Sequence, residues 1–119
     1  MLSKWFLAVM LAAVQDTLDS GRQALNAGDL TRAEQLFRQF LSQNPNSAEA
    51  LSNLGAICAR REQFSEALVF YEKALKANPK LVQVHFNMAI ALGHLREYDK
   101  AAQHLRRFLQ AYPQEARAR

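Results

Sequence analysis

The chain reads Leu41-Ser42-Gln43-Asn44-Pro45, then Leu75-Lys76-Ala77-Asn78-Pro79, then Leu109-Gln110-Ala111-Tyr112-Pro113. The prolines keep one spacing, since 79 − 45 = 34 and 113 − 79 = 34. A fixed period of this length predicts tandem structural repeats. Each stretch is expected to end a helix, because a residue that precedes proline disfavours the helical backbone region.

Between the prolines, apolar side chains recur at steps of three and four, which is typical of amphipathic helices. From Ala48 to Lys80 these positions form two runs, separated by Arg61-Glu62-Gln63. The first run contains Leu51, Leu54, Gly55 and Cys58, and the second contains Phe64, Ala67, Leu68, Tyr71, Ala74 and Leu75. Each repeat is therefore predicted to be a hairpin of two helices.

Small residues recur at matching places and predict a close approach of the two helices in each hairpin. They are Gly21, Gly55 and Ala89 in the first helices, and Ala33, Ala67 and Ala101 in the second. Bulky partners, namely Phe37, Tyr71 and Leu105, are expected to fill the space beside them.

This pattern resembles the tetratricopeptide repeat family. The second unit matches the family best, through Leu51, Leu54-Gly55, Ala67, Tyr71, Ala74 and Pro79, although Cys58 replaces the usual aromatic residue. The resemblance implies an all-α solenoid of antiparallel hairpins that curve into a right-handed superhelix. The expected repeats are residues 14–47, 48–81 and 82–115, and a basic tail follows at 116–119.

Residues 1–13 allow two interpretations. The apolar run from Trp5 to Val14 is about ten residues, roughly half of what a membrane-spanning helix needs. It has the size of the apolar region of a signal peptide, although the site around Ala13 is a poor cleavage site. Alternatively, the spacing of Leu7, Leu11 and Leu18 predicts a leading helix that continues into the first repeat and packs on it.

Composition narrows the function classes. The net charge is +4, but the basic residues are scattered, so nucleic-acid binding is not expected. One cysteine cannot form an internal disulfide bond. An exported or periplasmic location is expected if residues 1–13 are a signal peptide, and a cytoplasmic one otherwise. A membrane is expected as a partner only if that segment is a signal or an anchor.

An enzyme is not expected, and neither is a cofactor or a metal. The chain lacks the nucleophile-elbow, phosphate-loop and zinc-protease motifs. The three histidines, His85, His94 and His104, do not have the spacing of metal ligands and are expected at the surface or at helix interfaces.

The family resemblance implies that a peptide or protein segment binds on the concave side, which the first helices line. The candidate binding residues are Arg22, Asn53, Arg60, Phe86, Asn87, Ile90 and His94. Asn53 and Asn87 are equivalent, since 87 − 53 = 34. They are similar to the asparagine ladder in the repeats of O-linked N-acetylglucosamine transferases, although Asp19 interrupts it in the first unit. Alternatively, they hydrogen-bond only to neighbouring helices.

Phe86 and Ile90, one turn apart, would supply an apolar patch, unless they pack against an adjacent repeat. The clamp with which co-chaperone repeats hold acidic tails is not expected. Its positions hold Leu18, Arg22, Asn53, Gln83 and Asn87, of which only Asn53 matches.

The last hairpin predicts a second kind of surface. No further amphipathic helix follows Pro113, so one side of the final helix lacks a cover. The residues on this side are Ala102, Leu105, Leu109 and Tyr112. Either they meet another chain, or the sequence is part of a longer array. Two function hypotheses follow: a scaffold that binds a partner on its concave side, and a structural module that forms homo-oligomers through its last hairpin.

Overall fold

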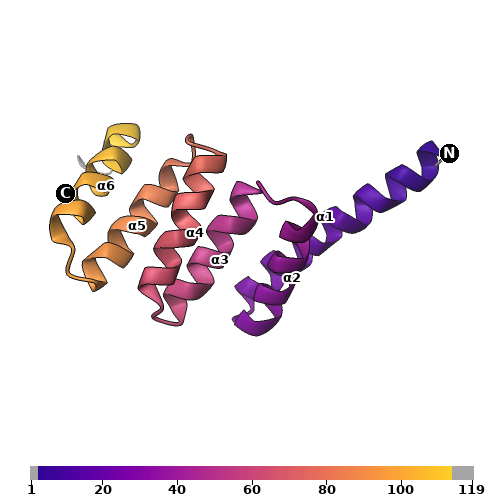
Figure 1. Ribbon diagram of the computed structural model, residues 1–119, viewed down its shortest axis with the longest axis horizontal. Coiled ribbons are helices and arrows are strands. Elements are labelled where there is room, and N and C mark those ends of the chain that lie inside the picture. Colours follow the sequence, from indigo (N-terminus) through magenta and orange to yellow (C-terminus); the bar gives the residue numbers. More distant parts are fainter. Residues whose placement is uncertain (1–2, 114–119) are drawn as a thin grey trace. The chain divides into compact units, whose positions relative to one another are not determined.

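The structure is a computed structural model that describes residues 3–113, with side chains described for all of these except 12–15. The described residues form six α-helices and no strand, as the sequence predicts (Figure 1). The helices are α1 (Lys4–Asn26), α2 (Leu30–Gln43), α3 (Ala48–Arg60), α4 (Phe64–Ala77), α5 (Val82–His94) and α6 (Tyr98–Ala111). Residues 114–119, which comprise the end of the third expected repeat and the whole of the expected basic tail at 116–119, lie outside the described range.

The chain divides into two compact units, Met1–Pro45 and Asn46–Arg119. Unit 1 is the hairpin of α1 and α2. Its core joins Leu18 and Leu25 of α1 to the fully buried Ala33 and Phe37 of α2. Side chains outside the helices fix where each one begins: the Ser3 hydroxyl accepts the Phe6 N–H, and the Asp29 carboxylate accepts the Arg32 N–H.

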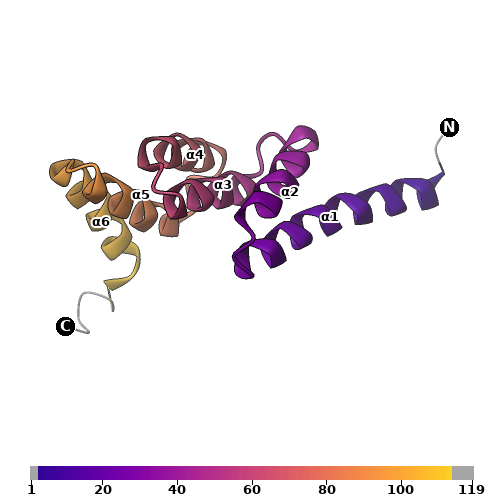
Figure 2. The same cartoon turned by 90° about the horizontal axis from the view of Figure 1, so that it is seen from below.

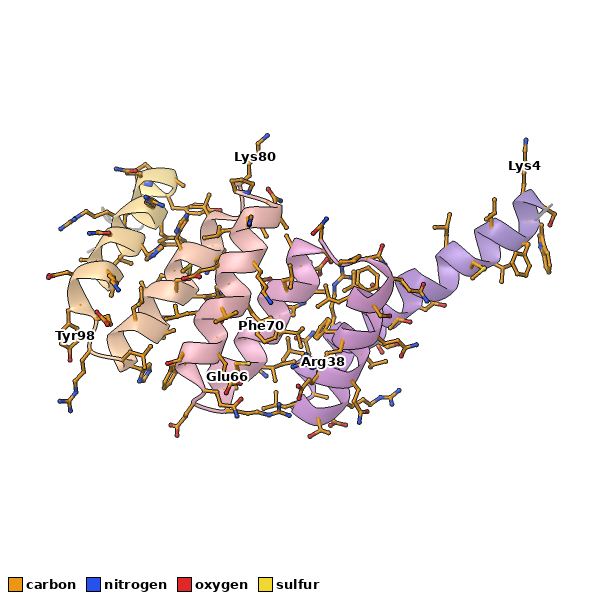
Figure 3. All side chains as sticks on the ribbon, viewed as in Figure 1. Lys4, Arg38, Glu66, Phe70, Lys80 and Tyr98 are labelled. Atoms are coloured by element: carbon orange, nitrogen blue, oxygen red, sulfur yellow. The ribbon has the colours of Figure 1, made fainter. Side chains whose placement is uncertain are left out.

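Helix α1 extends well past the end of α2 (Figure 2). It is continuous from Lys4, which lies near its outer end (Figure 3), to Asn26 in the first repeat. The expected packing of this extension is wrong for its described side chains. Residues 3–11 are all exposed, with Trp5 at 75% and Leu11 at 71%. No polar face interrupts the apolar run from Trp5 to Leu11, so α2 has no single stripe to cover.

Unit 2 contains the hairpins α3–α4 and α5–α6, and α4 packs against α5 (Figure 1). The Ser47 hydroxyl accepts the Ala50 N–H at the start of α3. Buried residues from three helices form one cluster, made of Cys58, Ala67, Tyr71, Val84 and Met88. Because this cluster joins the second helix of one repeat to the first helix of the next, it holds successive hairpins together as tandem repeats require.

The three turns within the hairpins share one geometry. Gly28, Glu62 and Arg96 occupy equivalent places, and their φ angles are 82°, 62° and 63°. In each turn the following residue donates its N–H to a carbonyl five residues earlier, as Gln63 does to Cys58 at 2.8 Å. This is the Schellman arrangement, in which a left-handed residue closes the end of a helix. The turn therefore repeats with the same period as the prolines.

The expected close approach of the helices is confirmed in the first two hairpins. A Cβ added to Gly21 would lie 2.8 Å from the Phe37 ring, and one added to Gly55 would lie 2.5 Å from the Tyr71 ring. The third hairpin differs, because the expected filler Leu105 is 38% exposed. Its position matches Tyr71, which α5 covers, whereas no described helix follows α6.

Candidate functional site

Two asparagines occupy the middle of successive first helices in unit 2. Asn53 lies on α3 and Asn87 on α5, and both side chains are half-buried. Neither side chain has a hydrogen bond, an ion pair or a ring contact within the described part of the chain. Each amide therefore keeps a carbonyl acceptor and an NH2 donor for another molecule. We call Asn53 and Asn87 the asparagine pair.

Besides the asparagine pair, α5 carries an exposed apolar residue, and the last turns of α3 and α5 each carry an exposed basic residue. Ile90 is 47% exposed, so its apolar side chain is accessible to another molecule. Arg60 and His94 hold equivalent places in the last turns of α3 and α5, and both are exposed. The His94 ring stacks on Phe64 with 4.2 Å between ring centroids and 3° between ring planes. This stack ties the end of α5 to the start of α4.

Phe86 has a different environment from Ile90. It is half-buried, and its ring centroid lies 5.0 Å from that of Phe108 on α6. Phe108 in turn lies 5.0 Å from Tyr112. Part of the Phe86 ring is thus used within its own hairpin, and Ile90 is the more accessible apolar residue. We call the set Asn53, Arg60, Phe86, Asn87, Ile90 and His94 the α3–α5 surface.

The candidate residue Arg22 belongs to unit 1. Its guanidinium forms an ion pair with the Asp19 carboxylate one turn earlier on α1. Asp19 is the residue that stands in the place of an asparagine in this repeat, so the first repeat presents a charged pair where the later two present amides. The positive charge of Arg22 is therefore already balanced locally.

The candidate self-association residues lie on α6 and, in the case of Tyr112, at its C-cap. Leu105 is 38% exposed and Tyr112 43% exposed, while Ala102 and Leu109 are half-buried. No residue of α6 is buried, in contrast to α4, where Ala67, Tyr71 and Ala74 are. We call Ala102, Leu105, Leu109 and Tyr112 the α6 face. It is apolar and only partly covered, whereas Tyr98 at the start of α6 extends outward into solvent (Figure 3).

One polar contact was missed by the sequence reasoning. His85 on α5 and His104 on α6 face each other, with 2.9 Å between their Nδ1 atoms. Both were expected at surfaces or helix interfaces, and they do lie at the interface of their hairpin. A comparison of repeats would have singled them out, since the equivalent positions in the second repeat are the apolar Leu51 and Phe70.

Two kinds of site are absent from the described residues. No group of three or more His, Cys, Asp or Glu side chains is arranged to hold a metal ion there. Within the same residues, no helix combines the length and the apolar character that are needed to cross a membrane.

Comparison with known proteins decides the family. One tetratricopeptide repeat model matches residues 18–82, and a second matches residues 59–119. The first alone covers more than half of the chain. The chain belongs to the tetratricopeptide repeat family. This confirms the resemblance that the prolines and the small residues indicated.

Relatives of this tetratricopeptide repeat (TPR) chain are much longer than the matched segment. Cellulose synthase operon protein C of Komagataeibacter xylinus is 39% identical over 61 residues, which is 51% of this chain and 5% of that protein. The peroxisomal targeting signal receptor of Candida glabrata is 31% identical over 77 residues, or 65% of this chain and 13% of the receptor. The TPR chain therefore spans a small fraction of the curated relatives that it matches.

A solved TPR structure shows the same fold. The first TPR domain of Spaghetti (RPAP3), bound to the HSP90 peptide SRMEEVD, gives a TM-score of 0.80 at 16% identity, covering 84% of this chain and 79% of that one. The likeness confirms the predicted solenoid of helical hairpins. At this level of identity it shows the fold alone.

Proposed function

We propose that this TPR chain is a non-catalytic protein-interaction scaffold, and that its α3–α5 surface binds an extended peptide segment of a partner protein. The observation that carries the proposal is the asparagine pair. Its two half-buried amides have no hydrogen bond within the described residues, and since no buried side-chain polar atom there lacks a partner, the amide atoms are accessible to a ligand. A ligand that supplies both donors and acceptors would satisfy them.

An extended peptide backbone is such a ligand. Each of its residues, proline excepted, offers one N–H donor and one C=O acceptor. A primary amide can pair with both at once, without reading the side chains of the peptide. Because Asn53 and Asn87 repeat with the period of the hairpins, they would engage two separate places along one strand of backbone.

Side chains of the α3–α5 surface would then add preference to this backbone contact. Ile90 is exposed and suits an apolar residue of the peptide. Arg60 at the end of α3 suits a carboxylate, since a guanidinium binds carboxylates in a bidentate manner. The proposal is consistent with the structural neighbour that was solved with a bound HSP90 peptide.

Binding to a selected peptide tests this proposal. Peptides that bind the wild-type chain would be selected from a random phage-display library, and the affinities of the selected peptides would be measured by calorimetry. We expect the double variant Asn53→Ala/Asn87→Ala to bind them at least about 30-fold more weakly, since it removes two hydrogen bonds from each asparagine and each bond is worth about 0.5–1.5 kcal/mol. Gln103→Ala removes an exposed amide from α6 and serves as the matched control.

Equal affinity of the double variant and the wild type for every selected peptide would refute the role of the asparagine pair. Reduced affinity in the Gln103→Ala control alone would place the peptide on α6 instead.

A second candidate function is self-association through the α6 face. It is favoured by one observation: α4 has its corresponding positions covered by Val84 and Met88 of α5, and α6 has no described helix in that place. The equivalents of these two covering residues on α1 are Asp16 and Ser20, since 84 − 68 = 16 and 88 − 68 = 20.

Asp16 and Ser20 are polar, so α1 of a second copy would be a poor cover for Leu105. A head-to-tail stack of copies is therefore disfavoured. We propose instead that two copies would pair α6 against α6 about a two-fold axis, which places the same apolar face on both sides.

A further inference from the structure

Among the described residues of unit 2, His85 and His104 form the one contact that places two titratable rings at the interface of a hairpin. Their Nδ1 atoms are 2.9 Å apart, and their ring centroids are 5.1 Å apart with 25° between the planes. His85 is 9% exposed and is the one buried side chain among those described that can carry a positive charge. His104 is half-buried on the facing helix.

The preceding hairpin shows that this place does not require polar residues. Leu51 on α3 and Phe70 on α4 hold the equivalent positions, since 85 − 34 = 51 and 104 − 34 = 70. Leu51 is buried, and Phe70 packs partly buried against the core cluster (Figure 3 labels Phe70). An apolar pair therefore fits the same fold, and the two histidines add a property that the fold itself does not need.

That property is the dependence of the contact between the two rings on their protonation. At a separation of 2.9 Å, one Nδ1 must carry a hydrogen and the other must accept it. A first added proton can bind to the far nitrogen, Nε2, of the donor ring, which leaves the hydrogen bond intact and makes it charge-assisted. A second proton makes both Nδ1 atoms donors. Two N–H groups and two positive charges then face each other, and the contact becomes repulsive.

The charged groups around the pair come from two helices. Arg107, on α6 with His104, disfavours a positive charge on either ring, whereas Glu72 on α4 favours one on His104. Burial lowers the pKa of His85 below its ordinary value, and Arg107 lowers it further. Burial also lowers the pKa of His104, with His85 and Arg107 acting in the same direction and Glu72 opposing them. The two rings titrate as a coupled pair.

We propose that the contact between His85 and His104 is acid-sensitive: it holds α6 on α5 near neutral pH and releases α6 when both rings are protonated. The inference goes beyond the proposed scaffold function, because it concerns the last hairpin whether or not a partner is bound.

The direction of the pH effect follows from proton linkage. When α6 is released, the histidines regain their ordinary pKa of 6.5, whereas in the closed hairpin both pKa values are lower. The released form binds more protons at mildly acidic pH, so acid favours it. The closed hairpin has its full stability above pH 6.5 and loses it as the pH falls from 6.5 through the lowered pKa values.

Hydrogen exchange of the full chain, read by mass spectrometry and corrected for the intrinsic effect of pH, tests this inference. We expect the protection of residues 98–111 to fall by up to about 100-fold between pH 7.5 and pH 5.5, because each of the two histidines that gains a proton on opening contributes up to about tenfold. Protection of α3 and α4 should change less over the same range, since most carboxylates keep their charge at pH 5.5.

The matched variant is His85→Leu/His104→Phe, which installs the residues that the preceding hairpin uses at these positions. We expect it to stay folded and to lose the pH dependence of protection in α6. The control His94→Gln removes the remaining histidine, which stacks on Phe64 and lies outside the pair, and it should keep the pH dependence of protection in α6.

Three results would overturn the inference. They are protection of α6 that does not change from pH 7.5 to pH 5.5, a dependence that persists in the double variant, and a loss of protection that is equal in all helices of unit 2. If the double variant does not fold, a histidine NMR titration of the wild type decides. Both pKa values must then lie below 6.5, and values at or above 6.5 would refute the proposed acid-sensitive contact.

Discussion

Gly55 lies so close to Tyr71 that a Cβ on the glycine would stand 2.5 Å from Cε1 of the ring. Tyr71 is 2% exposed, so its ring has little room to move away. We expect Gly55→Ala to lower the free energy of unfolding by up to about 2 kcal/mol. Overpacking costs about 1–3 kcal/mol, and the helix propensity of alanine returns up to about 1 kcal/mol. Urea denaturation measures the difference.

Gly93 supplies the matched control for this prediction. It lies in helix α5, and a Cβ there would meet nothing within 4 Å. Gly93→Ala should therefore raise the free energy of unfolding, by up to about 1 kcal/mol, because only the propensity gain remains. Two alanine substitutions with effects of the same sign would show that the contact with Tyr71 does not control the response.

The three left-handed turn residues predict opposite effects of adding and of removing a glycine. Glu62 and Arg96 adopt positive φ angles that glycine tolerates far better than other residues. Glu62→Gly and Arg96→Gly should each stabilise the chain by about 0.5–1 kcal/mol, whereas Gly28→Ala should destabilise it by about 1 kcal/mol. Thermal unfolding by circular dichroism measures all three, and destabilisation by both glycine substitutions would contradict the prediction.

Alkaline pH should destabilise the core of unit 2. Burial raises the pKa of Tyr71 to about 12, and nearby Cys58 contributes in the same direction. The folded chain keeps the phenolic proton at pH values where the unfolded chain loses it, so stability falls as the pH rises from 10 towards 12.

The Tyr71→Phe variant should lose this part of the pH dependence, as measured by denaturant unfolding at a series of alkaline pH values. Tyr98→Phe removes a phenol that is 65% exposed and is the control. A wild-type stability that is constant from pH 10 to 12 would count against the burial of the Tyr71 hydroxyl.

A charge introduced into the α6 face should prevent self-association, which is the second candidate function. Leu105→Asp places a carboxylate in the proposed contact between copies, and we expect it to make the chain monomeric by light scattering at a concentration where the wild type is dimeric. Gln103→Asp introduces the same charge at an exposed position of α6 and should leave the dimer intact. A wild type that stays monomeric at high concentration would rule out self-association.

Most of the fold could be predicted from the sequence because the same structural signals recur in each repeat. The prolines, the small residues and the short polar turns each mark a helix end or a close approach. The predicted break at Arg61-Glu62-Gln63 lies between α3 and α4 as the structure has them. The left-handed backbone at Glu62 and Arg96 could not be predicted, since only Gly28 carries the residue that signals it.

The candidate site was less accessible to sequence reasoning. The spacing placed Asn53 and Asn87 at equivalent positions, but whether their amides were already used depended on side-chain contacts that no spacing shows. The same holds for Arg22, whose ion pair with Asp19 depends on rotamers, and for Phe86, whose ring meets Phe108. Their role in binding a partner stays a prediction, as does the role of the α6 face.

Cys58 is the only cysteine of the chain, and its side chain is 7% exposed within the cluster of Tyr71, Val84 and Met88. A reagent such as a maleimide or an aromatic disulfide can reach this sulfur only when α3, α4 and α5 separate, because thiol chemistry requires direct access. The rate of modification under native conditions would therefore report how often this cluster opens. The protein contains its own single-site label for measuring that motion, without any engineered probe.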